Sequence, residues 1–169
     1  MATEGFSGAA SGGQLEEKLD LSKEVELKIP QASTLVDQGL LKDALALLFA
    51  LEKKCRTGND TPSLVKVCVA SLQHCKNAGD IEVLLTTLQT LCTRRSQKTQ
   101  AVRSLVELAM PWCLEDGYMP LKVANDAEKE NRDKLVVALR DITDGKIFLE
   151  AERAKLTRAL AIIKARCVV

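Results

Sequence analysis

The most reactive side chains of this chain belong to six cysteines and one histidine. His74 directly precedes Cys75, and Cys68 lies seven positions before Cys75, on the same face of a helix. A thiol beside an imidazole could serve as a nucleophile with its base, and two thiols with an imidazole could begin a metal site. However, adjacent residues of a helix point about 100° apart, which separates the thiol of Cys75 from the imidazole of His74.

The rest of the sequence adds little to either kind of chemistry. A closed zinc site needs four ligands, and this group offers three. The chain has neither of the glycine-rich phosphate-binding motifs, G-x-x-x-x-G-K-[ST] and G-x-G-x-x-G. We therefore expect no catalytic residue, no metal and no cofactor. A small helical thiol enzyme that uses Cys75 and His74 is the alternative from another class of protein.

One cluster of charge could bind a partner. The segment "RRSQKTQAVR" carries Arg94, Arg95, Lys98 and Arg103 and contains no acid. Cations near the end of a helix are also favoured by the helix dipole, so helix capping is one interpretation. The other is a docking patch for an acidic protein partner. Nucleic acid fits poorly, because no aromatic residues are interleaved for base stacking.

The composition sets the class of protein. Of the 169 residues, 46% are hydrophobic and only 3% are aromatic, and Leu, Ala, Lys and Glu favour helix over sheet. The net charge of +1 provides no field for nucleic acid or a membrane. The N-terminus does not resemble a signal peptide, and the cysteines lie among apolar residues as buried thiols do. We expect a protein of the cytoplasm and nucleus that binds neither nucleic acid, membrane nor a small-molecule substrate.

The hydrophobic periodicity predicts one helix after another. Pro30 is expected to open a short first helix, and Thr61 with Pro62 to cap and open a later one. A polar stretch at 115–132 is expected to connect two helices. The predicted helices are 30–38, 40–55, 63–78, 81–95, 97–110, 133–143 and 145–165.

Two of these helices are alike at an offset of 40 residues. The segment from Asp37 aligns with the segment from Asn77, so that Gly39 matches Gly79 and six apolar positions match in phase. A period near 40 with a glycine hinge is typical of an α-solenoid. We predict an all-α, right-handed α-solenoid of antiparallel helix-turn-helix repeats, similar to TPR or HEAT repeats, with about seven or eight helices. A disordered leader is expected at 1–20 and the helical-repeat domain at 21–169.

Several segments resemble a known family. "LLFALEKKCRTGND", "LCTRRSQKTQAV" and "LRDITDGKIFLEAERAKLTRALAIIKA" are similar, in the same order, to the N-terminal part of the proteasome non-ATPase regulatory subunit 12 family. These are PCI-family subunits of the regulatory-particle lid, and the similarity covers about residues 24 to 165. The related scaffold subunit of the signalosome complex is the alternative within the same class.

The resemblance implies a non-catalytic scaffold for ubiquitin-dependent protein degradation. Its implied partners are the other lid subunits, the ATPase ring and the outer ring of the core particle, and it implies no cofactor. Family members continue from such an array into a winged-helix PCI module, which we expect to be absent from this chain. The leader and the polar stretch at 115–132 depart from the family pattern.

The helix predicted at 145–165 carries apolar residues on two of its faces. One face carries large residues, including Leu149, Leu156 and Ile163, and the other carries Ile147 and a series of alanines. A helix that is buried on one side only would show one apolar stripe. We expect a helix built to be packed between neighbours, with one face partly exposed here or covered by the N-terminal segment or a second copy.

Overall fold

The structure, a computed structural model, describes residues 17–166, which form seven α-helices and one small antiparallel sheet. The prediction of an all-α helical-repeat fold is confirmed. The sheet consists of β1 (Leu114–Glu115) and β2 (Met119–Pro120), and two short 3-10 turns are η1 (Met110–Trp112) and η2 (Ile147–Leu149). The helices are α1 (Ser22–Asp37), α2 (Leu41–Thr57), α3 (Thr61–Ala78), α4 (Ile81–Thr93), α5 (Thr99–Ala109), α6 (Asp126–Thr143) and α7 (Glu150–Arg166).

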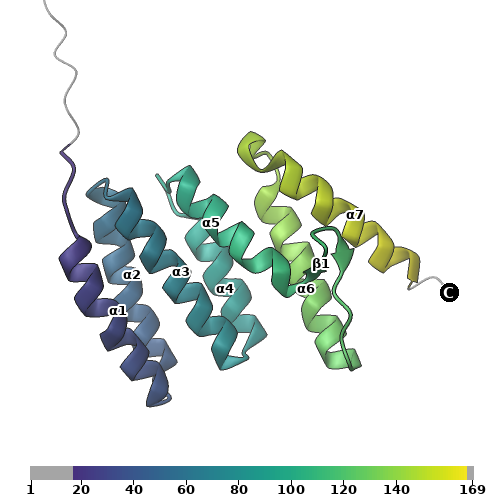
Figure 1. The fold of residues 1–169 in the computed structure, drawn as a ribbon, viewed down its shortest axis with the longest axis horizontal. Coiled ribbons are helices and arrows are strands. Elements are labelled where there is room, and N and C mark those ends of the chain that lie inside the picture. The colour runs from purple at the N-terminus through teal and green to yellow at the C-terminus, as the bar shows by residue number, and fades with distance from the viewer. Residues whose placement is uncertain (1–16, 167–169) are drawn as a thin grey trace, which may run out of the picture.

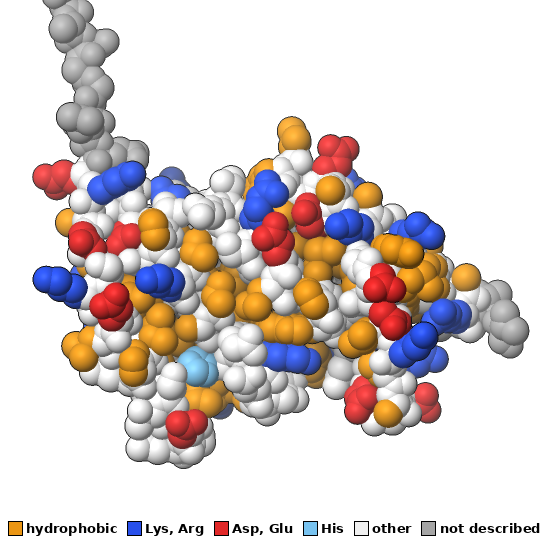
Figure 2. All heavy atoms as spheres, viewed as in Figure 1, with side chains coloured by type: hydrophobic (Ala, Val, Ile, Leu, Met, Phe, Trp, Pro, Cys, Tyr) orange, Lys and Arg blue, Asp and Glu red, His pale blue; other side chains and the backbone are white. Residues whose placement is uncertain are grey.

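The helices follow one another in chain order along the long axis, so that α1 and α7 lie at opposite ends (Figure 1). α1, α3 and α5 pack side by side in one layer, and α4 and α6 are neighbours in the other. Apolar side chains gather across the middle of the face that α1, α3 and α5 form (Figure 2). One continuous core joins the layers, and its fully buried leucines include Leu48, Leu72, Leu88, Leu105 and Leu139.

The predicted repeat is visible in the backbone. Gly39 follows α1 with a φ of 79°, and Gly79 follows α3 with a φ of 76°. Both are left-handed conformations that glycine adopts at little cost, and each reverses the chain into the next helix. After Gly79, the side chain of Asp80 accepts hydrogen bonds from the backbone N–H groups of Glu82 and Val83 at 3.0 and 3.2 Å, which caps α4.

The expectation that Pro30 opens a short helix is wrong, because α1 begins at Ser22 and contains Pro30. Proline inside a helix removes one backbone hydrogen bond. Pro30 is exposed, whereas Val25 before it and Ala32 after it are buried, so both halves of α1 remain anchored in the core. Tertiary packing therefore overrides the local signal at Pro30.

The cap of α3 also lies one residue earlier than predicted. Asp60, not Thr61, is the N-cap, and its side chain accepts from the backbone N–H of Ser63 at 3.2 Å. The same carboxylate accepts from the backbone N–H of Leu21 at 2.8 Å, which attaches the start of α1 to the start of α3.

The predicted leader at 1–20 stays a prediction. Residues 1–16 lie outside the described part of the chain. Leu19 is described, and its backbone N–H donates to the carbonyl of Gly58 at 2.9 Å.

The polar stretch at 115–132 is more structured than predicted. Leu114 pairs with Pro120 across a hairpin, and α6 begins at Asp126, ahead of the predicted residue 133. The side chain of Asn125 accepts from the N–H of Glu128 at 2.9 Å, and Glu128 accepts from the N–H of Ala124 at 3.1 Å. The Asn125 cap, with Glu128 bound to the residue before it, starts the helix before its apolar residues begin.

The segment formed by η2 and α7 is apolar on two sides, and within residues 17–166 one of these sides is covered. Leu149 and Leu156 are fully buried and Ile163 nearly so, whereas Ile147 on the opposite face is 89% exposed. The alanines of that opposite face are exposed as well, namely Ala151, Ala154, Ala161 and Ala165. The prediction that one face of this helix is exposed is therefore confirmed. No helix in the described residues has the length and apolarity to cross a bilayer.

Candidate functional site

The predicted docking cluster lies where α4 passes into α5. Arg94, Arg95 and Lys98 are in the loop, and Arg103 is on α5. The loop turns sharply at Ser96, whose φ of 61° is left-handed, and the N–H of Gln97 donates to the carbonyl of Arg94 at 3.1 Å. The tight turn directs the side chain of Gln97 back toward the body of the protein.

A buried carboxylate receives that side chain. Glu52 of α2 is 0% exposed, and its Oε1 accepts from Gln97 Nε2 at 3.1 Å and from Arg56 Nε at 2.9 Å. Gln97 Nε2 also donates to the carbonyl of Leu91 at 2.8 Å. The α4–α5 loop is thus attached to α2 through a charged group inside the protein.

Arg94 belongs to the same junction. Its Nε lies 3.6 Å from Glu52 Oε2, and its guanidinium lies over the ring of Phe49 at 5.4 Å. Neither Glu52 Oε2 nor Arg94 Nε has a hydrogen-bond partner among the described residues. The Arg94 guanidinium thus faces the buried charge of Glu52, while 32% of its side chain stays exposed.

The other three cations diverge. Lys98 Nζ donates to Asn59 Oδ1 at 2.6 Å, and Arg103 Nη2 donates to the carbonyl of Phe148 at 2.7 Å while its guanidinium lies 5.9 Å from that ring. The backbone carbonyl of Arg95 accepts a hydrogen bond from Arg56 Nη1 at 2.8 Å. The side chain of Arg95 is exposed. Of the four cations, Arg95 alone has no side-chain hydrogen bond, ion pair or cation–π pair within residues 17–166. Docking of a partner at this cluster stays a prediction.

The reactive pair of the sequence lies apart from this loop. The nearest polar contact of His74 is Ser33 of α1, with Nε2 and Oγ 3.4 Å apart, and burial lowers the pKa of His74. Cys75 is fully buried and its Sγ donates to Thr87 Oγ1 at 3.4 Å. Burial raises the pKa of Cys75 and outweighs that hydrogen bond, which disfavours the thiolate that a nucleophile requires.

The other described cysteines are buried too. Burial raises the pKa of Cys55 to about 11 and the pKa values of Cys92 and Cys113 to about 12. In the described residues no three His, Cys, Asp or Glu side chains are grouped so that they could hold a metal ion. Cys167 lies outside the described part of the chain.

Sequence reasoning missed Glu52, although a signal was present. Glu52 follows Leu48 by four residues and precedes Cys55 by three, so it falls on the core face of α2. A charged residue at a core position needs a partner, and Arg56 one turn later is an obvious one. The distant partners Arg94 and Gln97 could not be found in this way.

The fold places the chain among helical-repeat proteins, in which stacked helix pairs form extended surfaces for other proteins. The family model described as PSMD12/CSN4, N-terminal, matches residues 43–167. The chain belongs to this family.

Its relatives are subunits of one assembly. It is 32% identical to the 26S proteasome non-ATPase regulatory subunit 12 of Dictyostelium discoideum over 86% of this chain and 30% of that protein. It is 32% identical to homolog A of that subunit in Arabidopsis thaliana over 76% of this chain and 27% of the relative. The 26S proteasome regulatory subunit RPN5 of Saccharomyces cerevisiae is 26% identical over 86% of this chain and 31% of its own length. The chain thus spans about 30% of the length of the relatives it matches.

Proposed function

We propose that this chain is a non-catalytic scaffold, a protein-interaction module of the proteasome regulatory-particle lid that serves ubiquitin-dependent degradation. The observation that carries the proposal is the match to a 26S proteasome regulatory subunit over 86% of the chain, together with the helical-repeat array that residues 17–166 form. The candidate partners are other lid subunits, the ATPase ring and the outer ring of the core particle. The corresponding locations are the cytoplasm and the nucleus.

The signalosome alternative has less support. The family model covers both PSMD12 and CSN4 and does not separate them, whereas the relatives reported above are all proteasome regulatory subunits. The thiol-enzyme alternative is disfavoured by the complete burial of Cys75 and by its raised pKa. A scaffold without catalysis is therefore the better account of these residues.

Within this scaffold, the exposed side chain of Arg95 is the proposed docking element of the basic cluster. Reversal of an exposed charge at the rim of an interface weakens association without disturbing the fold. The purified 169-residue chain, immobilised, should retain purified 26S proteasome, and Arg95→Glu should retain less of it. Lys53→Glu, at an exposed lysine of α2, is the matched control and should retain as much as the wild type.

Three results are informative. Loss with Arg95→Glu alone supports docking at the cluster. Equal retention by all three proteins would confine the cluster to a structural role. Failure of the wild-type chain to retain any proteasome would contradict the scaffold proposal for this part of the family.

A further inference from the structure

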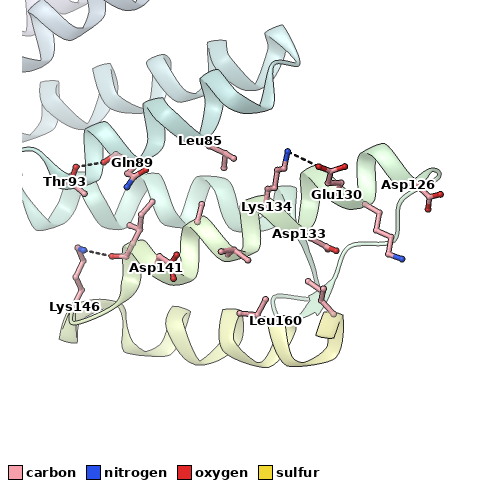
Figure 3. Close-up of a pocket in the computed structure, with 15 residues that line it drawn as sticks. Leu85, Gln89, Thr93, Asp126, Glu130, Asp133, Lys134, Asp141, Lys146 and Leu160 are labelled. Carbon is pink, nitrogen blue, oxygen red and sulfur yellow. Dashed lines mark hydrogen bonds and ion pairs between the residues drawn. The ribbon is translucent and has the colours of Figure 1, made fainter. Parts of the chain in front are cut away.

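A groove follows the outward face of α6, between α4 on one side and α7 on the other (Figure 3). Its volume is about 840 Å³. Leu85 of α4 and Leu160 and Ile163 of α7 form its apolar walls, and Val137 and Ala138 of α6 form its floor. Val137 is 42% exposed, which is unusual for a β-branched side chain at the centre of a hollow.

The charges beside this apolar centre are largely balanced within the chain. Lys134 Nζ lies 3.1 Å from Glu130 Oε1 and 3.3 Å from Glu82 Oε1. Asp133 Oδ1 accepts from Arg132 Nε at 2.8 Å. The middle of the groove therefore presents apolar surface with a neutralised rim, as the centre of a protein interface does.

One end of the groove differs from its middle in charge. A second hollow of about 300 Å³ opens at the start of α6 and shares Asp126, Lys129 and Ile163 with the groove, so the two adjoin. Its charged lining consists of four cations and one acid, namely Lys122, Lys129, Arg132, Arg166 and Asp126.

Two of these cations are free to bind. Arg132 is 8% exposed, donates to the carbonyl of Leu121 at 2.8 Å and is ion-paired with Asp133, so it offers a partner neither a free charge nor a contact. Lys122 Nζ has Glu115 Oε2 at 3.8 Å. Lys129 and Arg166 are exposed, and neither has an ion pair within residues 17–166.

We propose that the groove docks a segment of a partner protein in which a cluster of apolar side chains adjoins a cluster of acidic ones. The apolar side chains would cover Val137 and lie between Leu85 and Leu160. The acidic side chains would enter the cationic hollow and pair with Lys129 and Arg166. Charge complementarity orients the segment, because the cationic hollow lies at one end of the groove. This surface is separate from the Arg95 loop, so its test stands apart from that of the proposed function.

The test is selection of peptides from a random 16-residue display library on the purified 169-residue chain, followed by affinity measurement by fluorescence anisotropy. The enriched peptides should carry acidic residues to one side of an apolar cluster. The best peptide should bind at least about tenfold more weakly to the double variant Lys129→Glu with Arg166→Glu, and also to Val137→Asp. Its binding should weaken as salt is raised, because exposed charges are screened.

Lys155→Glu is the matched control. Lys155 is an exposed cation of α7 that does not line the groove, and its reversal should leave the affinity unchanged. Circular dichroism melts show whether each variant keeps its fold. All substituted side chains are at least partly exposed, so the melts should be similar to that of the wild type.

Each other outcome overturns the proposal. Enriched peptides without acidic bias, or with affinities that the groove variants do not change, would remove the groove as the site. The absence of any enriched peptide would do the same. Self-association of the chain in sedimentation, abolished by Val137→Asp, would make a second copy the occupant instead of a partner segment.

Discussion

The buried carboxylate of Glu52 accepts a hydrogen bond from the side chain of Gln97 at 3.1 Å, across 45 positions of sequence. Glu52 lies on α2, and Gln97 lies in the loop between α4 and α5. The bond joins the first helix pair to the end of the second through one charged group. The first predictions concern this junction.

Replacement of Glu52 should destabilise the protein strongly. Glu52→Ala leaves the guanidinium groups of Arg56 and Arg94 beside a cavity without their counter-charge, and the loss should be about 3 kcal/mol in the free energy of unfolding. Urea denaturation measures it. Glu107→Ala, at an exposed acid of α5, is the control and should cost about 0.5 kcal/mol or less. Equal losses for the two variants would contradict a structural role for Glu52.

The two adjacent arginines should behave differently. Arg94→Glu places a second carboxylate beside Glu52, so it should lower the thermal unfolding temperature. Arg95→Glu changes an exposed side chain and should leave that temperature nearly unchanged. Differential scanning fluorimetry compares them directly. A larger decrease for Arg95→Glu than for Arg94→Glu would contradict the assignment of their contacts.

Asp60 should make the free energy of unfolding depend on pH in the acidic range, below the ordinary pKa of an aspartate. Burial raises the pKa of Asp60, but hydrogen bonds from Ser63 and Leu21 outweigh it and hold the pKa below 3.8. The charged form is thus favoured in the folded state. Its stabilisation is fully present above pH 3.8 and is lost as the pH falls through the lower, folded value.

The measurement is the free energy of unfolding of wild type and Asp60→Asn from pH 7 to pH 2.5. The difference should be constant above about pH 5 and should shrink below pH 3.8, the unfolded reference value. Asp60→Ala removes the cap of α3 as well and should cost about 1 kcal/mol more at neutral pH. A difference between wild type and Asp60→Asn that does not change with pH would exclude this linkage.

The thiols should be inert in the native state. In a Cys167→Ser variant the remaining five cysteines are all buried, and burial raises the pKa of each. Their reaction with Ellman's reagent at pH 8 should be slow until urea unfolds the chain, and then all five should react. Rapid labelling of Cys75 in the native protein would revive the thiol-enzyme alternative.

Most of the helices could be predicted from the sequence, because apolar spacing and helix-ending glycines depend only on residues close together in the chain. The leucine spacing located α2 through α5, and the matched glycines at 39 and 79 predicted two hinges, which the structure shows to be left-handed. The start of α1 was predicted wrongly from Pro30. The helix continues through Pro30 because Val25 and Ala32 are buried on either side of it, and that burial is a property of the packed array. The α6 start was missed because the caps made by Asn125 and Glu128, not apolar periodicity, begin that helix.

The candidate site was predicted less well, for a physical reason. Four cations close in sequence look like one patch, but each side chain extends to whatever the fold brings near it. Lys98 reaches Asn59 across 39 positions and Arg103 reaches Phe148 across 45. Such distances in sequence carry no periodic signal. The groove on α6 depends in the same way on how α4 and α7 flank that helix.

The most direct test of the central claim is affinity purification of the tagged gene product from its own cells, followed by quantitative mass spectrometry against a tag-only control. The scaffold account predicts enrichment of proteasome regulatory-particle subunits in mutually consistent amounts. Recovery of no proteasome subunit above the control would contradict it.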